Sequence, residues 1–191
     1  MNYSYYSSVA LVSSVVVYLL AFFAHAAEWA SARRDPATEE VAERRLVSVG
    51  AGSGGGAPVE ADQVEAYARS LADARLADLR VEQFNRMGVF LTVLGFLLSL
   101  IGVIGRGLAA GRAPWGNMYE FTTMALVFVV AAYLLMVWRA GLSWLGLPVT
   151  LLATVGNGLA VTVFFVAVAP LVPALHSVWF VIHISAAAIA G

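Results

Sequence analysis

The sequence predicts an all-α, polytopic membrane protein with four complete transmembrane helices, the start of a fifth, and the N-terminus outside. Composition is the first observation behind this prediction. Of the 191 residues, 61% are apolar and 12% are charged, whereas soluble domains have about 45–50% apolar and about 25% charged residues. The second observation is that the charged residues cluster. The stretches between the clusters are long enough to cross about 30 Å of hydrocarbon.

The first transmembrane helix is predicted over residues 1–27, which contain no charged residue. This stretch is too long and too aromatic for a signal peptide and lacks a basic n-region. Residues 28–86 follow as a cytoplasmic loop that holds eight of the eleven arginines. Within the loop, a Gly-rich stretch at 50–58 is typical of a flexible linker. A helix predicted over 60–86 is expected to run on into the next span.

Two surface ion pairs support the helix predicted in this loop. Glu65 precedes Arg69 by four residues, and Glu82 precedes Arg86 by the same spacing. Such pairs stabilise an isolated helix by about 0.2–0.5 kcal/mol each. A solvated surface helix therefore accounts for this segment.

Residues 87–191 are predicted to hold the remaining membrane helices. Uncharged stretches predict three further complete spans, over 87–105, 117–138 and about 148–169. Pro170 and Pro173 then interrupt the helix, because proline removes a backbone donor. A fifth helix begins near His176 and offers too few residues for a full span.

The distribution of arginine predicts the orientation. The N-terminus has no arginine, the 28–86 loop has eight and the 106–116 loop has two. Because loops rich in Lys and Arg stay on the cytoplasmic side, the N-terminus is expected outside. The 106–116 loop and the 170–175 turn then also lie outside. Arg106 and Arg112 run against the rule there, which makes them functional candidates.

Charge and residue types exclude several classes of function. The formal net charge is −1, so no global basic field attracts nucleic acid, and the partner that composition indicates is the lipid bilayer. These residues include no cysteine, which excludes thiolate nucleophiles and iron–sulfur ligation by them. All eleven basic residues are arginines, so lysine Schiff-base chemistry is excluded as well. Any metal or cofactor would use His, Met or carboxylates.

His176 and His183 are candidate ligands in the fifth helix. Their spacing of seven residues puts them on one helix face, about 10.5 Å apart along the axis. A single metal ion with ligands at about 2.0–2.1 Å cannot take both. Each could serve separately as an axial haem ligand. The alternative is an interfacial His176 and a His183 hydrogen-bonded between helices. Trp179 beside them suits a flat macrocycle and equally an interfacial aromatic belt.

The segment Arg112-Ala-Pro-Trp-Gly-Asn-Met-Tyr-Glu-Phe121 is the most distinctive in the chain. Asn117 can cap the third span, and Glu120 three residues later completes an N-x-x-E capping box. That interpretation needs no function. The alternative is an outward-facing site lined by Arg112, Trp115 and Glu120, with the arginine poised for an anionic group.

Two other polar residues lie in the predicted spans. His25 is near the inner end of the first span, close to Glu28, where snorkelling to the interface accounts for it. Asn157 lies between Gly156 and Gly158. That arrangement indicates close helix packing or an interhelical hydrogen bond.

Two segments together resemble a known family. Residues 112–121 resemble the R-x-P-x-x-N-x-Y-E stretch of CcsA/ResC/CcsB-type cytochrome c biogenesis proteins, which belong to a haem-handling superfamily. Residues 173–185 are similar to that family's P-x-L-x-S-x-W-x-x-I-H-V segment. The resemblance covers about the C-terminal half of the chain, 87–191. The absence of lysine and the Glu/Arg-rich inner loop are similar to an actinobacterial version.

The resemblance implies a subunit of the type II cytochrome c maturation system in a bacterial plasma membrane. Such a subunit delivers haem at the outer face for covalent attachment to the CxxCH motif of apocytochrome c. The implied cofactor is b-type haem in transit, and the implied partner is a ResB-type membrane protein. By motif position, His183 is an axial ligand of the haem iron. The other implied cofactor-binding residues are Trp179, Arg112, Trp115 and Glu120. No catalytic residue is implied, and membership of a haem lyase complex is left open.

Part of the family's haem site lies further along in those proteins than the helix that reaches Gly191. The tryptophan-rich WWD segment, a second outer-face histidine and a membrane-embedded histidine are the missing parts. These 191 residues are therefore expected to hold half of a haem site, as the truncated front part of the family region. The alternative from another functional class is a non-catalytic membrane scaffold or small transporter subunit without haem. In it, His183 and Glu120 are packing and capping groups.

Overall fold

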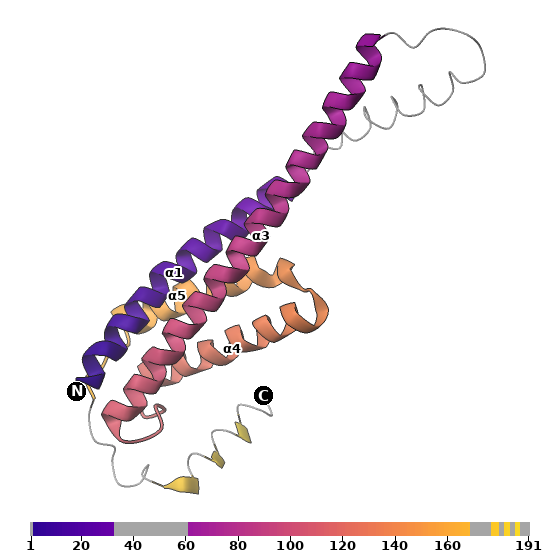
Figure 1. Cartoon of the computed structure of the whole chain (residues 1–191). Coiled ribbons are helices and arrows are strands. Elements are labelled where there is room, and N and C mark those ends of the chain that lie inside the picture. Colours follow the sequence, from indigo (N-terminus) through magenta and orange to yellow (C-terminus); the bar gives the residue numbers. More distant parts are fainter. Residues whose placement is uncertain (1, 33–60, 169–176, 180–181, 184–185, 188–191) are drawn as a thin grey trace. The chain divides into compact units, whose positions relative to one another are not determined.

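A computed structural model describes residues 2–32, 61–168, 177–179, 182–183 and 186–187 of the chain (Figure 1). These residues form helices, turns and irregular stretches, and none of them is in a strand. The helices are α1 (Tyr3–Ala32), α3 (Ala61–Ala110), α4 (Met118–Ala140), the 3-10 helix η2 (Ser143–Leu145) and α5 (Gly146–Thr162).

In the part of the chain that the structure describes, four helical segments are long and apolar enough to cross a membrane. They are Tyr3–Ala32, Ala68–Ala110, Met118–Ala140 and Ser143–Thr162. By length and composition, the prediction of an all-α, multi-pass membrane protein is confirmed. Of the predicted fifth helix, only short pieces such as 178–179 and 182–183 are described, and they are helical. The Gly-rich stretch 50–58 and His176 lie outside the described residues.

Helix α3 covers both the predicted loop helix and the predicted second span in one continuous run of 50 residues. It ends at Gly111, whose φ of 63° lies in the left-handed region, where glycine pays no Cβ penalty. Helix α4 begins after Asn117, as the capping pattern predicts. It ends at Gly141, with a φ of 65°. Local residues thus decide where α3 ends and where α4 begins and ends.

Helix α5 is shorter than predicted, because it ends at Thr162 and not near residue 169. The residues around this end, Val161 to Val166, are all β-branched or aromatic, and such side chains lose χ1 freedom in a helix. Proline affects the stretch after this end. In a continued helix the carbonyl of Val166 would bond to the backbone N–H of residue 170, and Pro170 has none. The Val166 carbonyl is therefore left for another donor.

The described residues belong to two compact units, Met1–Phe23 with Gly88–Gly191 in the first and Ala24–Met87 in the second. In the first unit, α1 and the second half of α3 run antiparallel. The hydroxyl of Ser7 donates to the carbonyl of Gly102 at 2.6 Å, and the ring of Tyr18 lies against Gly95. Small residues at these positions allow the two backbones to approach closely.

The core of the first unit combines residues from all four long helices. One buried cluster contains Leu11, Val103, Tyr119, Val127 and Ala160, and a second contains Tyr18, Val130 and Ala153. Phe96 packs against both clusters and joins them. Close packing of this kind leaves few voids, so a buried polar group in this unit is costly unless it has a partner within the protein.

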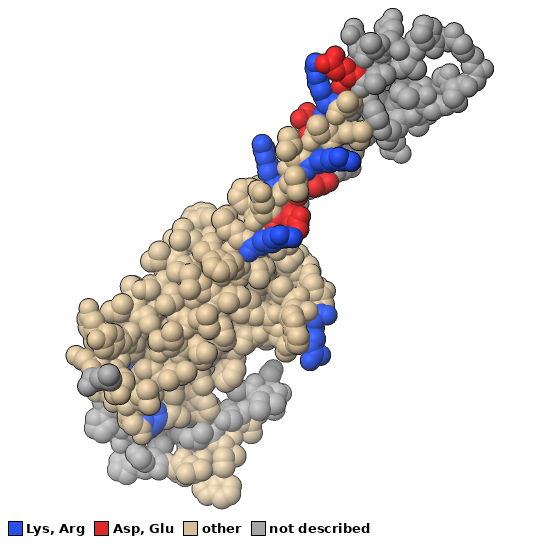
Figure 2. Space-filling model, in the orientation of Figure 1, with Lys and Arg blue, Asp and Glu red and all other residues tan. Residues whose placement is uncertain are grey.

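The second unit carries most of the described charged side chains. They gather on the first part of α3 (Figure 2). Arg69 donates to Glu65 at 2.6 Å, and Arg86 donates to Glu82 at 2.5 Å. Both predicted i,i+4 pairs are thereby confirmed, and all four side chains are exposed.

Candidate functional site

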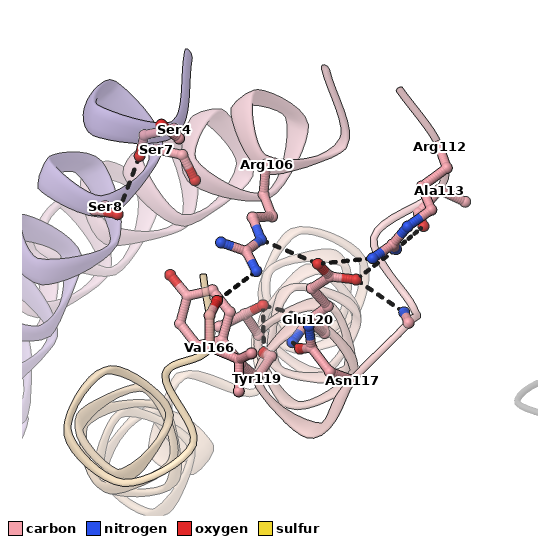
Figure 3. A network of polar contacts seen from close by, with 12 residues as sticks. Ser4, Ser7, Ser8, Arg106, Arg112, Ala113, Asn117, Tyr119, Glu120 and Val166 are labelled. Carbon is pink, nitrogen blue, oxygen red and sulfur yellow. Dashed lines mark hydrogen bonds and ion pairs between the residues drawn. The ribbon is translucent and has the colours of Figure 1, made fainter. Parts of the chain in front are cut away.

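The candidate site lies where α3 ends and α4 begins, and Glu120 is at its centre. The Glu120 side chain is 0% exposed. Its Oε1 accepts a hydrogen bond from Nε of Arg106 at 3.0 Å. Its Oε2 accepts from Nη1 of Arg112 at 2.7 Å and from the backbone N–H of Gly116 at 2.8 Å (Figure 3). One carboxylate thus joins α3, the connecting turn and α4.

The capping box is formed only in part. The side-chain oxygen of Asn117 accepts from the backbone N–H of Glu120 at 2.9 Å, as predicted. The carboxylate of Glu120, however, accepts from Gly116, one residue before the cap. Its remaining acceptor capacity is directed at Arg106 and Arg112, which add ionic attraction and the fork of guanidinium donors to the hydrogen bonds.

Arg106 connects the network to the end of α5. Its side chain is 4% exposed, and its Nη2 donates to the carbonyl of Val166 at 2.6 Å. This is the carbonyl that Pro170 would leave without a partner, so the guanidinium replaces the missing amide. The Cζ of Arg106 also lies 5.1 Å from the ring centroid of Tyr119, which packs edge-on against Phe165 at 5.4 Å.

The prediction missed the role of Arg106 as the link between three segments. The sequence carried one signal, the proline four residues after Val166, which marks a carbonyl in need of a donor. It carried no signal for which donor would reach it, because Arg106 is 60 positions away.

The charges of this network do not cancel. Arg106 and Arg112 supply two positive charges, and Glu120 supplies one negative charge, so the cluster carries a net charge of +1. The side chain of Arg112 is 11% exposed. Its Nε is buried and has no hydrogen-bond partner among the described residues. Buried charge of this kind is costly unless it is paired. The excess therefore favours an anionic group beside Arg112.

The structure brings only part of the predicted haem-site residues together. Arg112 and Glu120 are bonded directly, and half-buried Trp115 belongs to the same turn. Trp179 and His183 lie in short described pieces further along and are exposed, Trp179 at 78%. None of the described contacts joins Trp179 or His183 to Arg112 or Glu120.

The described side chains of the second segment are open to solvent. His183 carries an exposed imidazole, a group that can ligate haem iron, and Trp179 carries an exposed indole. Within the part of the chain that the structure describes, no group of three or more His, Cys, Asp or Glu could hold a metal ion.

The two other polar residues of the predicted spans differ in how they compare with their predicted roles. His25 is buried, and its Nδ1 lies 3.1 Å from Oε2 of Glu28, so the prediction that it snorkels to the interface is wrong. Asn157 is 1% exposed, and Gly156 beside it packs against Leu126. Close helix packing is therefore the reading that applies to Asn157. Its amide atoms have no hydrogen-bond partner among the described residues.

Comparison with known proteins identifies no relative of this chain. No protein-family model matches it, and no curated protein or solved structure is significantly similar to it.

Proposed function

We propose that this chain is a membrane subunit of the type II cytochrome c maturation system, which handles haem at the outer face for covalent attachment to apocytochrome c. The observation that carries the proposal is the joint occurrence of the two family-like segments, 112–121 and 173–185, in one chain. In this proposal the protein is embedded in a bacterial plasma membrane, and its N-terminus lies outside. A ResB-type membrane protein is the partner.

The geometry of the first segment supports an organised site at this end of the helices. Glu120 is fully buried and holds the guanidinium of Arg112, so it acts on any ligand through that arginine. Arg106 fixes Glu120 from the other side. In the proposal, Arg112 and Trp115 face the cofactor, and Glu120 positions Arg112.

The exposure of Trp179 and His183 in the second segment supports a ligand role for these two residues. His183 would hold the haem iron through an imidazole nitrogen, and Trp179 would pack against the macrocycle. The haem itself would supply the vinyl groups that react with the cysteine thiols of apocytochrome c. The protein's contribution is to bind and orient the haem at the membrane surface.

Haem content of the assembled complex tests this proposal. The native gene product is purified with its ResB-type partner, and haem per protein is measured together with the absorption spectrum. His183→Ala is expected to lower haem content by more than half, and added imidazole is expected to restore the spectrum. His176→Ala is the matched control, since the resemblance assigns it no ligand role. Equal haem content and identical spectra in His183→Ala and the unsubstituted protein would refute the ligand assignment.

A membrane scaffold without haem is the second candidate, and one observation favours it. The carboxylate of Glu120 accepts hydrogen bonds from Arg106, Arg112 and Gly116. These three contacts are sufficient for a purely structural role. If the complex with the ResB-type partner contains no haem in any variant, the scaffold function replaces haem handling.

A further inference from the structure

An apolar groove opens beside the charged network. Its volume is about 430 Å³, within the range of small-molecule sites, about 300–1,000 Å³. Ile104 and Leu108 of α3 line it, together with Met124 of α4 and residues of the turn at 111–114. The side chains of Ile104 and Leu108 are more than half exposed, at 53% and 60%. The groove is therefore accessible from the side of the helices.

The groove lies at one end of a membrane-spanning segment. Ile104 and Leu108 belong to the segment Ala68–Ala110, and Met124 belongs to Met118–Ala140. A side of such a helix that no other helix covers faces lipid tails. An apolar groove in this place is thus positioned for a hydrocarbon chain that lies along the helices.

Arg112 is the charged residue of this groove among its described lining residues. It belongs to the cluster whose two guanidinium groups face a single carboxylate, Glu120. The net charge of +1 of this cluster therefore lies at the end of the groove that the turn at 111–114 lines. A ligand that matches both features has an apolar chain and an anionic group at one end.

We infer that this groove is a binding site for an anionic phospholipid, with one acyl chain along Ile104 and Leu108 and the phosphate beside Arg112. A phospholipid has its chain and its phosphate in the required order, because the phosphate sits at the membrane surface where α3 ends. Charge complementarity favours a lipid with a net negative charge over a zwitterionic one. One basic residue near a membrane contributes about 1 kcal/mol to such binding, which corresponds to about a five-fold preference.

Retention of lipid by the full chain tests the inference. The protein is purified in detergent, exposed to equal amounts of phosphatidylglycerol and phosphatidylcholine with identical acyl chains, and examined by native mass spectrometry. The expected result is one retained phospholipid per chain, with about a five-fold preference for phosphatidylglycerol. Glycerol phosphate, which lacks acyl chains, is expected not to displace it. Equal retention of the two lipids, or displacement by glycerol phosphate, overturns the inference.

A pair of substitutions on α3 tests the location of the lipid without disturbing the charged network. Leu108→Trp fills the groove and is expected to abolish the preferential retention. Leu97→Trp is the matched control, because Leu97 is exposed on the same helix and does not line the groove. Lipid retention by Leu108→Trp equal to that of Leu97→Trp places the lipid elsewhere and overturns the inference. If Leu108→Trp does not fold, the lipid preference of the unsubstituted protein still decides the outcome.

This inference shares Arg112 with the proposed function, because Arg112 belongs to the segment 112–121. The two tests remain distinguishable. Ile104 and Leu108 belong to neither segment of the proposed function, and the readout here is bound lipid, whereas the test of the proposed function measures haem.

Discussion

Among the described residues, ion pairs between arginine and glutamate occur in two settings, and their difference shows what burial does to the same chemistry. In the first part of α3, Glu65–Arg69 and Glu82–Arg86 are separate pairs whose side chains are at least half exposed. Where α3 ends and α4 begins, Glu120 is fully buried and accepts hydrogen bonds from two arginines and a backbone amide. The exposed pairs join residues four apart on one helix, whereas the buried network joins three segments.

The two settings carry different energetic consequences. Water solvates each partner of an exposed pair almost as well as its counter-ion does, so such a pair contributes little. In the buried network each group has lost its water, and removal of one partner leaves the others unpaired. The same residue types therefore support a local helix in one region and tertiary structure in the other.

Glu120→Ala is expected to have the largest effect, because it leaves Arg106 and Arg112 without their carboxylate. Loss of one partner of a buried ion pair costs about 3–5 kcal/mol. The free energy of unfolding is measured by reversible denaturation in mixed micelles. Glu120→Gln is the control. It retains the shape of the side chain and one acceptor oxygen, so its free energy of unfolding should fall by less. A loss below 1 kcal/mol for Glu120→Ala would show that the network is no more important than an exposed pair.

Gly116→Ala is expected to have an intermediate effect, because it disturbs the network without removing a charge. A Cβ at this position would lie 2.6–2.7 Å from the guanidinium of Arg112 and push it away from Glu120. Overpacking of this kind costs about 1–3 kcal/mol, measured by the same denaturation. Gly158→Ala is the control without a clash, since a Cβ there meets nothing within 4 Å, and inside α5 it should raise stability by up to about 1 kcal/mol. A Gly116→Ala variant as stable as the unsubstituted protein would mean that Arg112 moves aside without loss.

Arg69→Ala is expected to have the smallest effect. An exposed i,i+4 pair contributes about 0.3–0.5 kcal/mol, and the helical content at 222 nm should change only slightly. The effect of salt is expected to differ between the two regions as well. At 1 M salt the Debye length is about 3 Å, so the difference between Arg69→Ala and the unsubstituted protein should vanish, while that for Glu120→Ala should persist. If Arg69→Ala lowered the free energy of unfolding by more than about 1 kcal/mol, and salt did not change this loss, the exposed pair would not differ from the buried network as expected.

The local part of the candidate site could be predicted from the sequence. Asn117 caps α4, and Glu120 lies three residues later within reach of that cap, because capping depends on neighbouring residues. The pairs Glu65–Arg69 and Glu82–Arg86 follow from helix geometry in the same way. The bond between Arg106 and Glu120 could not be predicted, since it joins residues fourteen positions apart across a turn.

By itself, the sequence determined that the protein is helical and has four segments able to cross a membrane. The physical reason is local, because a chain in hydrocarbon must satisfy its backbone hydrogen bonds within each segment. Tertiary structure alone decided which buried side chains meet. It placed Arg106 against Val166, placed His25 in the interior beside Glu28, and enclosed Glu120 between two arginines. Those partners depend on how whole helices pack, and helix packing is set by many distant contacts at once.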